Sequence, residues 1–221
     1  MMKPRVYLGQ TRSTALIERL NELGFGEMTA RGELPPRRTP WAYDNGAFSD
    51  WRAGIRFDDR RFEMDLHQIE SAEVRPDFLV VPDLVARGRE SLDFSFAWLE
   101  RLPERCCPYY LAVQDGMEAP EVLDALNDFD GLFVGGSLSW KLRTGEVWAA
   151  IARHRNKPSH VGRAGTFNRL RWAIRCGFTS VDSCAPLWTE GNLLRFIAGL
   201  AEDRQLGWWE HPENMEALMH G

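Results

Sequence analysis

Short apolar segments alternate with longer amphipathic segments along most of the chain. Residues 78–81, Phe-Leu-Val-Val, are typical of the short segments, because they are apolar at every position. That pattern indicates a strand buried on both faces, as in a parallel sheet covered by helices. We predict eight such strands, at residues 5–9, 25–30, 41–44, 78–82, 109–114, 131–134, 159–161 and 179–182.

The segments between the predicted strands carry apolar residues at helical spacing. Leu16, Leu20 and Leu23 share one stripe, with Ser13 in position to cap the start of the helix and Gly24 to end it. Similar stripes occupy residues 92–102, 122–126, 167–174 and 193–197. Strands that alternate with helices in this way predict an α/β fold.

Eight strand-and-helix units in 221 residues predict one compact (β/α)8 barrel of the TIM type, in a single domain. The second unit is the weakest, because residues 32–40, Gly-Glu-Leu-Pro-Pro-Arg-Arg-Thr-Pro, have the composition of a loop. A doubly wound open sheet is the alternative, since the order of elements does not reveal whether the sheet closes. Residues 207–221 are rich in tryptophan and acidic residues, and we expect them to form a C-terminal arm or cap.

The composition is that of an ordinary globular protein, with 44% hydrophobic and 27% charged residues, which excludes global disorder. No apolar run reaches the roughly 20 residues of a membrane span. The first residues enter a predicted strand without the apolar region of a signal peptide. The four cysteines form no CxxC pair, so we expect reduced thiols. These features predict a cytoplasmic protein with no membrane partner.

The net charge of −5 is unevenly distributed along the chain. Residues 137–176 contain nine lysine and arginine residues and one acid, a net charge of +8, which leaves −13 for the rest. A basic segment on an acidic protein suggests an anionic partner, of which nucleic acid is the common one. The alternative is that these side chains are the solvated outer faces of helices.

Polar residues stand where several predicted strands end. Asp44, Asp83, Gln114 and Asp182 each follow an apolar strand, and in a barrel all four would face the same mouth. Any one of the aspartates alone reads as a turn or cap residue. Together these side chains would be partly desolvated and close to like charges, an arrangement that is typical of functional sites.

Six motifs in this order resemble the tRNA-guanine transglycosylase superfamily. They are Tyr-Asp-Asn-Gly-Ala-Phe at 43–48, Val-Pro-Asp at 81–83, Leu-Ala-Val-Gln at 111–114, Phe-Val-Gly-Gly at 133–136, His-Val-Gly-Arg at 160–163 and Ser-Val-Asp-Ser at 180–183. The chain looks closest to the short, DpdA-like branch found in phages and in DNA-modification clusters, which inserts 7-deazaguanines into DNA. The resemblance spans about residues 41–182, and it implies a bacterial or phage-infected cell.

The resemblance implies roles for the residues at the strand ends. Asp182 matches the family's nucleophilic aspartate, and Asp44 matches the aspartate that handles protons and touches the purine. Asp83 and Gln114 match the residues that bond the guanine edge. Asn45 stands where serine is commoner in the family.

Backbone and basic residues complete the expected site. The resemblance implies that Gly135 and Gly136 let the backbone approach the base closely. From their position alone, Lys141, Arg143 and Arg163 lie in or just after loops at the same mouth, where they could hold nucleic-acid phosphates.

The family's zinc module has no counterpart here. That module uses a cysteine cluster and a histidine after the nucleophile, and the chain after Asp182 offers only Cys184, His211 and His220. We therefore expect no metal and no cofactor, and DNA is favoured over tRNA as the substrate. The expected small partner is a 7-deazaguanine base such as preQ0. The need for a protein partner that opens duplex DNA is left open.

The chemistry of base exchange agrees with these residue types. Replacing a base at C1′ passes through an oxocarbenium-like state, which one carboxylate can trap as a covalent sugar–enzyme intermediate. A second carboxylate with a raised pKa can protonate the leaving base and deprotonate the incoming one. Aspartate accepts from N1–H and the 2-amino group of guanine, while glutamine or backbone N–H donates to O6. His160, within a predicted strand, reads as a satisfied core histidine rather than a base.

Two other functions remain open from the sequence. The glycines at 135–136 and Gly162-Arg163 could form the phosphate cradle of a metabolic barrel that acts on a sugar phosphate. A non-catalytic barrel that binds nucleic acid as a subunit of a modification complex is the second alternative.

Overall fold

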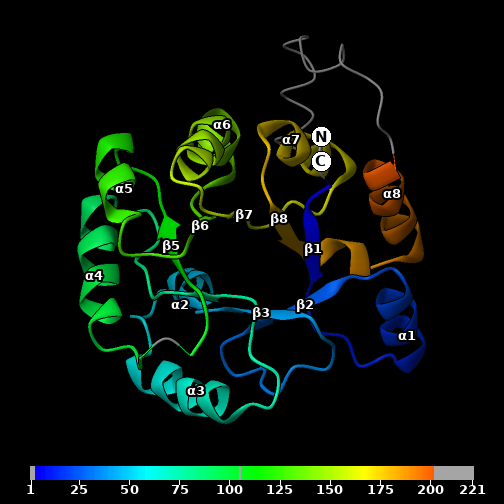
Figure 1. Ribbon diagram of the computed structural model, residues 1–221. Helices are drawn as coiled ribbons and strands as arrows, with labels where there is room; N and C mark the ends of the chain where they lie inside the picture. Colours follow the sequence, from blue (N-terminus) through cyan, green and yellow to red (C-terminus); the bar gives the residue numbers. More distant parts are fainter. Residues whose placement is uncertain (1–2, 105, 202–221) are drawn as a thin grey trace.

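Eight parallel strands close into a barrel in the computed structural model, which describes residues 3–104 and 106–201 (Figure 1). The strands pair in chain order, and β1 closes the ring by pairing with β8, with Tyr7 beside Asp182. Their bounds are β1 Arg5–Leu8, β2 Gly26–Ala30, β3 Trp41–Asp44, β4 Leu79–Val80, β5 Tyr109–Val113, β6 Gly131–Val134, β7 Ser159–Val161 and β8 Ser180–Ser183. The predicted TIM-like barrel is confirmed and the open sheet is excluded, whereas the expected arm at 207–221 lies outside the described residues.

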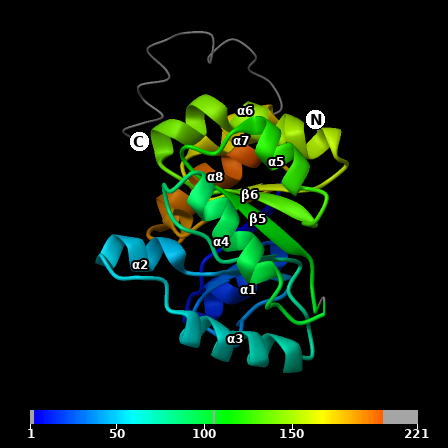
Figure 2. The same cartoon turned by 90° about the vertical axis from the view of Figure 1, so that its left-hand side faces the viewer.

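The helices form a ring around the barrel, except that α2 lies at one end of the barrel (Figures 1 and 2). They are α1 Thr14–Glu22, α2 Ala47–Ala53, α3 Asp59–Ser71, α4 Arg89–Leu99, α5 Ala119–Ala125, α6 Leu138–His154, α7 Phe167–Cys176 and α8 Glu190–Ala201, with a 3-10 turn at Ala185–Leu187. The Ser13 side chain caps α1 as predicted, accepting from the backbone N–H of Leu16 at 3.4 Å. None of the helices in the described ranges is long and apolar enough to cross a membrane.

The β2–β3 connection contains no helix among its described residues, as the loop-like composition of residues 32–40 predicts. A buried ion pair lies in this region instead. Glu27 and Arg38 approach to 3.3 Å with both side chains 0% exposed, and Arg38 also donates to the carbonyl oxygen of Leu8 at 2.9 Å. The β3–β4 connection contains two helices, α2 and α3, so α2 and the segment that follows it lie beside the barrel mouth.

Alternation along the strands separates two apolar layers. Tyr7 packs in the barrel interior, while its neighbours Val6 and Leu8 pack outward against the helices. The interior layer consists of Tyr7, Met28, Ala42, Phe78, Val80, Tyr110, Ala112 and Phe133. Phe78 and Tyr110 stack face to face in it at 4.2 Å. This packed interior is a floor, above which the strand-end side chains surround an open space.

Candidate active site at the barrel mouth

A cavity of about 340 Å³ opens at the carboxyl ends of the strands. Its wall contains eight of the nine residues singled out from the sequence: Asp44, Asp83, Gln114, Gly135, Gly136, Lys141, Arg163 and Asp182. Arg143 is the exception, because it lies on the exposed side of α6 and does not line the cavity. The residues come from β3, β8, α6 and the segments that follow β4 to β7, so closure of the barrel is what brings them together.

Asp83 is held by two amide side chains. Asn45 Nδ2 donates to its Oδ1 at 2.7 Å, and Gln114 Nε2 donates to its Oδ2 at 2.5 Å. Asn45 also donates to the carbonyl oxygen of Val81 at 2.9 Å, which fixes its amide plane. One hydrogen bond on each oxygen orients the carboxyl group, and the second lone pair of each oxygen remains as an acceptor. Asn45 is therefore a site residue whose contact with Asp83 the sequence did not reveal.

The pKa values of Asp83 and Asp44 are displaced upward. Burial raises the pKa of Asp83 to about 7, against the opposing effect of its bonds from Asn45 and Gln114. Burial also raises the pKa of Asp44, and the negative charge of Asp182 adds to this, while a bond from the Gly46 N–H at 2.9 Å acts in the other direction. A raised pKa favours the acid form of a carboxyl group, which suits it to proton transfer.

Asp182 is bonded from below by His160. The Nε2 atom of His160 lies 2.9 Å from Asp182 Oδ1, and its Nδ1 atom lies 2.9 Å from the Ser180 hydroxyl. An ionised carboxylate only accepts, so Nε2 carries the hydrogen in the bond to Asp182. The imidazole stacks on Phe133 at 5.1 Å and is fully buried. His160 is buried, as expected, but it also contacts a candidate catalytic residue.

Strand alternation could have revealed the His160 contact. His160 pairs with Ser180 across β7 and β8, and residues two apart on a strand face the same side. Asp182 therefore lies one inward position above His160 on the neighbouring strand. Residue type alone, a histidine in an apolar strand, did not carry that information.

Lys141 and Arg163 both line the cavity, at positions just after and within a loop as predicted. Lys141 lies in the first turn of α6, is 2% exposed, and donates to the Gly162 carbonyl oxygen at 2.5 Å. Burial, helped by the positive charge of Arg163, lowers the pKa of Lys141 to about 7. Arg163 has a left-handed backbone, with φ of 62°, donates to the Gly136 carbonyl oxygen and lies over the Phe48 ring at 4.2 Å.

The two glycines after β6 leave room that a side chain would fill. A Cβ atom on Gly135 would lie 2.6 Å from Gln114 Nε2, which is too close for the observed amide position. Gly136 has φ of 73°, a conformation that favours glycine. Gly135 donates its N–H to Val113, whereas the Gly136 N–H has no partner within the described part of the chain. Gly136 therefore has a backbone N–H that a ligand in the cavity can use.

No cluster of three or more histidine, cysteine, aspartate and glutamate side chains suited to a metal occurs within residues 3–104 and 106–201. Cys184 lines the cavity two residues after Asp182, and burial raises the pKa of its thiol to about 11. The site therefore offers carboxyl, amide, imidazole, ammonium and guanidinium groups. That set can hold a polar heterocycle by its edge, move a proton and supply a carboxylate nucleophile.

Comparison with known proteins adds no relative, since no model of a known protein family and no curated protein sequence matches this chain.

Proposed function

We propose that the protein exchanges a guanine-type base at C1′ of a nucleotide in nucleic acid, through a covalent bond between Asp182 and the sugar. The observation that carries this proposal is the convergence of three carboxyl groups with different surroundings in one cavity. Asp182 is bonded to an imidazole, while burial raises the pKa of Asp44 and of Asp83. The resemblance of the six strand-end motifs to guanine transglycosylases supports the same assignment.

Base recognition falls to Asp83, Gln114 and Gly136. The free acceptor positions of Asp83 match N1–H and the 2-amino group of guanine. The second amide hydrogen of Gln114 and the unpartnered N–H of Gly136 match the O6 acceptor. Bonds from two guanine N–H groups would favour the ionised form of Asp83 over the protonated form, so binding and deprotonation of Asp83 are coupled.

The first chemical step breaks the bond between the base and the sugar. A carboxylate oxygen of Asp182 forms a bond to C1′ as the C1′–N9 bond breaks, and its electron pair goes to the departing base. Asp44 in its acid form gives its proton to that base. The His160 N–H orients the Asp182 carboxylate from below and leaves Oδ2 without a bond from the ring.

The second step reverses the first with another base. The incoming 7-deazaguanine loses the proton on N9 to Asp44, and N9 forms a bond to C1′. The bond between C1′ and Asp182 then breaks and restores the carboxylate. No cofactor or metal enters this balance, because the second base is the only co-reactant.

A base-exchange assay tests the proposal. Radiolabelled guanine is incubated with the protein and, separately, with single-stranded DNA, duplex DNA and tRNA. We expect label to enter DNA, and Asp182→Asn and Asp44→Asn to abolish incorporation while circular dichroism shows an unchanged fold. Guanine binding without incorporation into any polymer would favour the alternative of a non-catalytic binding barrel, and full incorporation by Asp182→Asn would contradict the role of Asp182.

A further inference from the structure

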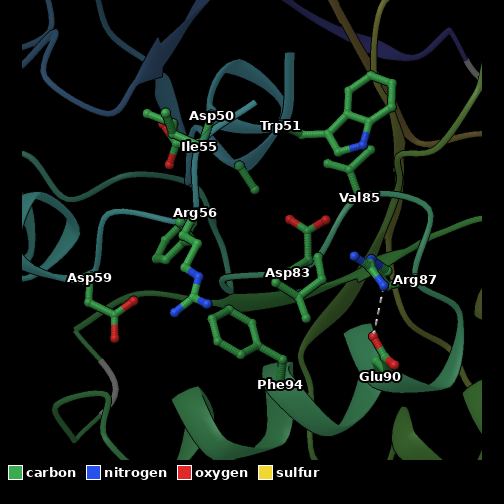
Figure 3. Close-up of a pocket in the computed structure, with 13 residues that line it drawn as sticks. Asp50, Trp51, Ile55, Arg56, Asp59, Asp83, Val85, Arg87, Glu90 and Phe94 are labelled. Atoms are coloured by element: carbon green, nitrogen blue, oxygen red, sulfur yellow. Dashed lines mark ion pairs between the residues drawn. The ribbon is translucent and has the colours of Figure 1, made fainter. Parts of the chain in front are cut away.

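A second cavity, of about 430 Å³, lies beside the first and shares two wall residues with it, Asp83 and Val85. Its other walls are α2, the segment that follows α2, and α4 (Figure 3). Trp51 comes from α2, Arg56 from the segment after it, and Phe94 from α4. A chain-like ligand with one unit in the first cavity can therefore continue directly into the second.

The second cavity has aromatic and apolar groups that remain open to solvent. Trp51 is 53% exposed and Ile55 is 59% exposed, and both line the cavity. Neighbouring exposed apolar side chains at a concave surface are typical of binding sites. A half-exposed indole can serve as a stacking platform for a nucleobase of any sequence.

Most charged groups that line the cavity are paired, except Arg56 and the carboxyl group of Asp83, which is bonded by two amides instead. Asp50 is bonded to Arg31, Asp59 lies 3.4 Å from Arg101, and Arg87 lies 3.6 Å from Glu90. Arg56 is exposed and has no ion-pair partner among the described residues. A guanidinium without an ion-pair partner and an aromatic side chain, both on the wall of one cavity, form a combination that proteins use to bind single-stranded nucleic acid (Figure 3).

We propose that this second cavity binds the nucleotide next to the target nucleotide, with its base stacked on Trp51 and its phosphate beside Arg56. The inference rests on the proposed function, because it places the target base in the first cavity. It makes the substrate a single-stranded or locally opened strand rather than a free nucleoside. The strand is read by stacking and charge, so sequence preference at this neighbouring position is weak.

Strand binding and base binding are measured separately to test the inference. Fluorescence anisotropy reports the affinity for fluorescein-labelled pentanucleotides with one central guanine, one made of DNA and one of RNA. Equilibrium dialysis with radiolabelled guanine reports occupancy of the first cavity. We expect Trp51→Ala to weaken binding of at least one pentanucleotide by roughly 5- to 150-fold, and to leave guanine affinity unchanged.

Matched variants separate the cavity from general surface effects. Trp188→Ala removes another exposed tryptophan, one that lines neither cavity and is 74% exposed, and we expect no change in either affinity. Arg56→Gln should lower the dependence of pentanucleotide affinity on salt by about one ion, whereas Arg52→Gln, on the exposed side of α2, should not.

The outcomes distinguish this inference from the proposed function. Guanine binding together with unchanged pentanucleotide affinity in Trp51→Ala, or with no pentanucleotide binding by the unmodified protein, overturns the second site and leaves base exchange standing. Failure of the unmodified protein to bind guanine contradicts the proposed function itself. The DNA and RNA arms identify which polymer the site accepts.

Discussion

The Nε2 atom of His160 lies 2.9 Å from Oδ1 of Asp182, so a buried ring on β7 orients the carboxylate assigned as nucleophile on β8. The ring is itself held by Ser180 and by stacking on Phe133. Because its position is fixed on both sides, His160 acts as a positioning residue for Asp182. Its contribution is separable from packing, since a phenylalanine would keep the stack and lose the N–H.

Replacing His160 should therefore lower the rate of base exchange, and the loss should depend on whether the new side chain keeps an N–H donor. We expect His160→Phe to reduce the rate of base exchange by on the order of 10²-fold, the cost of a misplaced reacting group, with guanine affinity unchanged. His160→Gln keeps an N–H that can reach Asp182 and should recover part of the rate. Equal losses in the two variants would indicate a purely structural role.

Gly135→Ala tests the close contact between the β6 loop and Gln114. The added Cβ atom would lie 2.6 Å from Gln114 Nε2, so the amide must leave the position in which it bonds Asp83. We expect guanine affinity, measured by equilibrium dialysis, to fall about tenfold, which is the effect of losing one good hydrogen bond. Gly191→Ala is the matched control, because its added Cβ atom would have no neighbour closer than 3.9 Å, and it should bind guanine normally.

The stability of the protein should pass through a minimum near pH 7. Asp83 has its folded pKa raised to about 7, so the folded state holds an extra proton, and stability falls as pH rises from about 4 to 7. Lys141 has its folded pKa lowered to about 7, so stability is regained as pH rises from 7 towards 10.5. Over each of these pH ranges, the free energy of unfolding changes by on the order of 4 kcal/mol.

Urea denaturation at a series of pH values checks this profile. Asp83→Asn should reduce the fall in the free energy of unfolding between pH 4 and 7, to which the raised pKa of Asp44 also contributes, and leave the alkaline rise. Lys141→Met should remove the alkaline rise and leave the fall between pH 4 and 7. A profile that keeps both slopes in both variants would contradict the assignment of these slopes to the two buried groups.

Most of the fold could be predicted from the strand pattern, because a fully covered parallel strand is apolar at consecutive positions, as at residues 78–81. Closure of the barrel leaves no such signal in the sequence. The pairing of β1 with β8 joins residues far apart in the chain, and no local pattern reports it. It followed only from the number of units and the chain length.

The candidate site likewise contains residues that the sequence identified and contacts that it did not. Asp44, Gln114 and Asp182 were found because each ends or follows an apolar strand, which is a local signal. The bonds of Asn45 to Asp83 and of His160 to Asp182 join neighbouring strands or the segments that follow them, so they depend on strand pairing and register, which residue type alone does not report. The burial of Lys141 depends on α6 packing over Gly162, and charge alone suggested a surface residue.

The covalent intermediate is the most direct test of the account. Protein is incubated with a guanine-containing single-stranded oligonucleotide without any incoming base, then denatured and digested with protease. Mass spectrometry should find the oligonucleotide, minus its guanine, attached to the peptide that contains Asp182, and the adduct should disappear when free guanine is added before denaturation. An adduct on another residue, or base exchange that proceeds with no adduct under conditions that preserve aspartyl esters, would contradict Asp182 as the nucleophile.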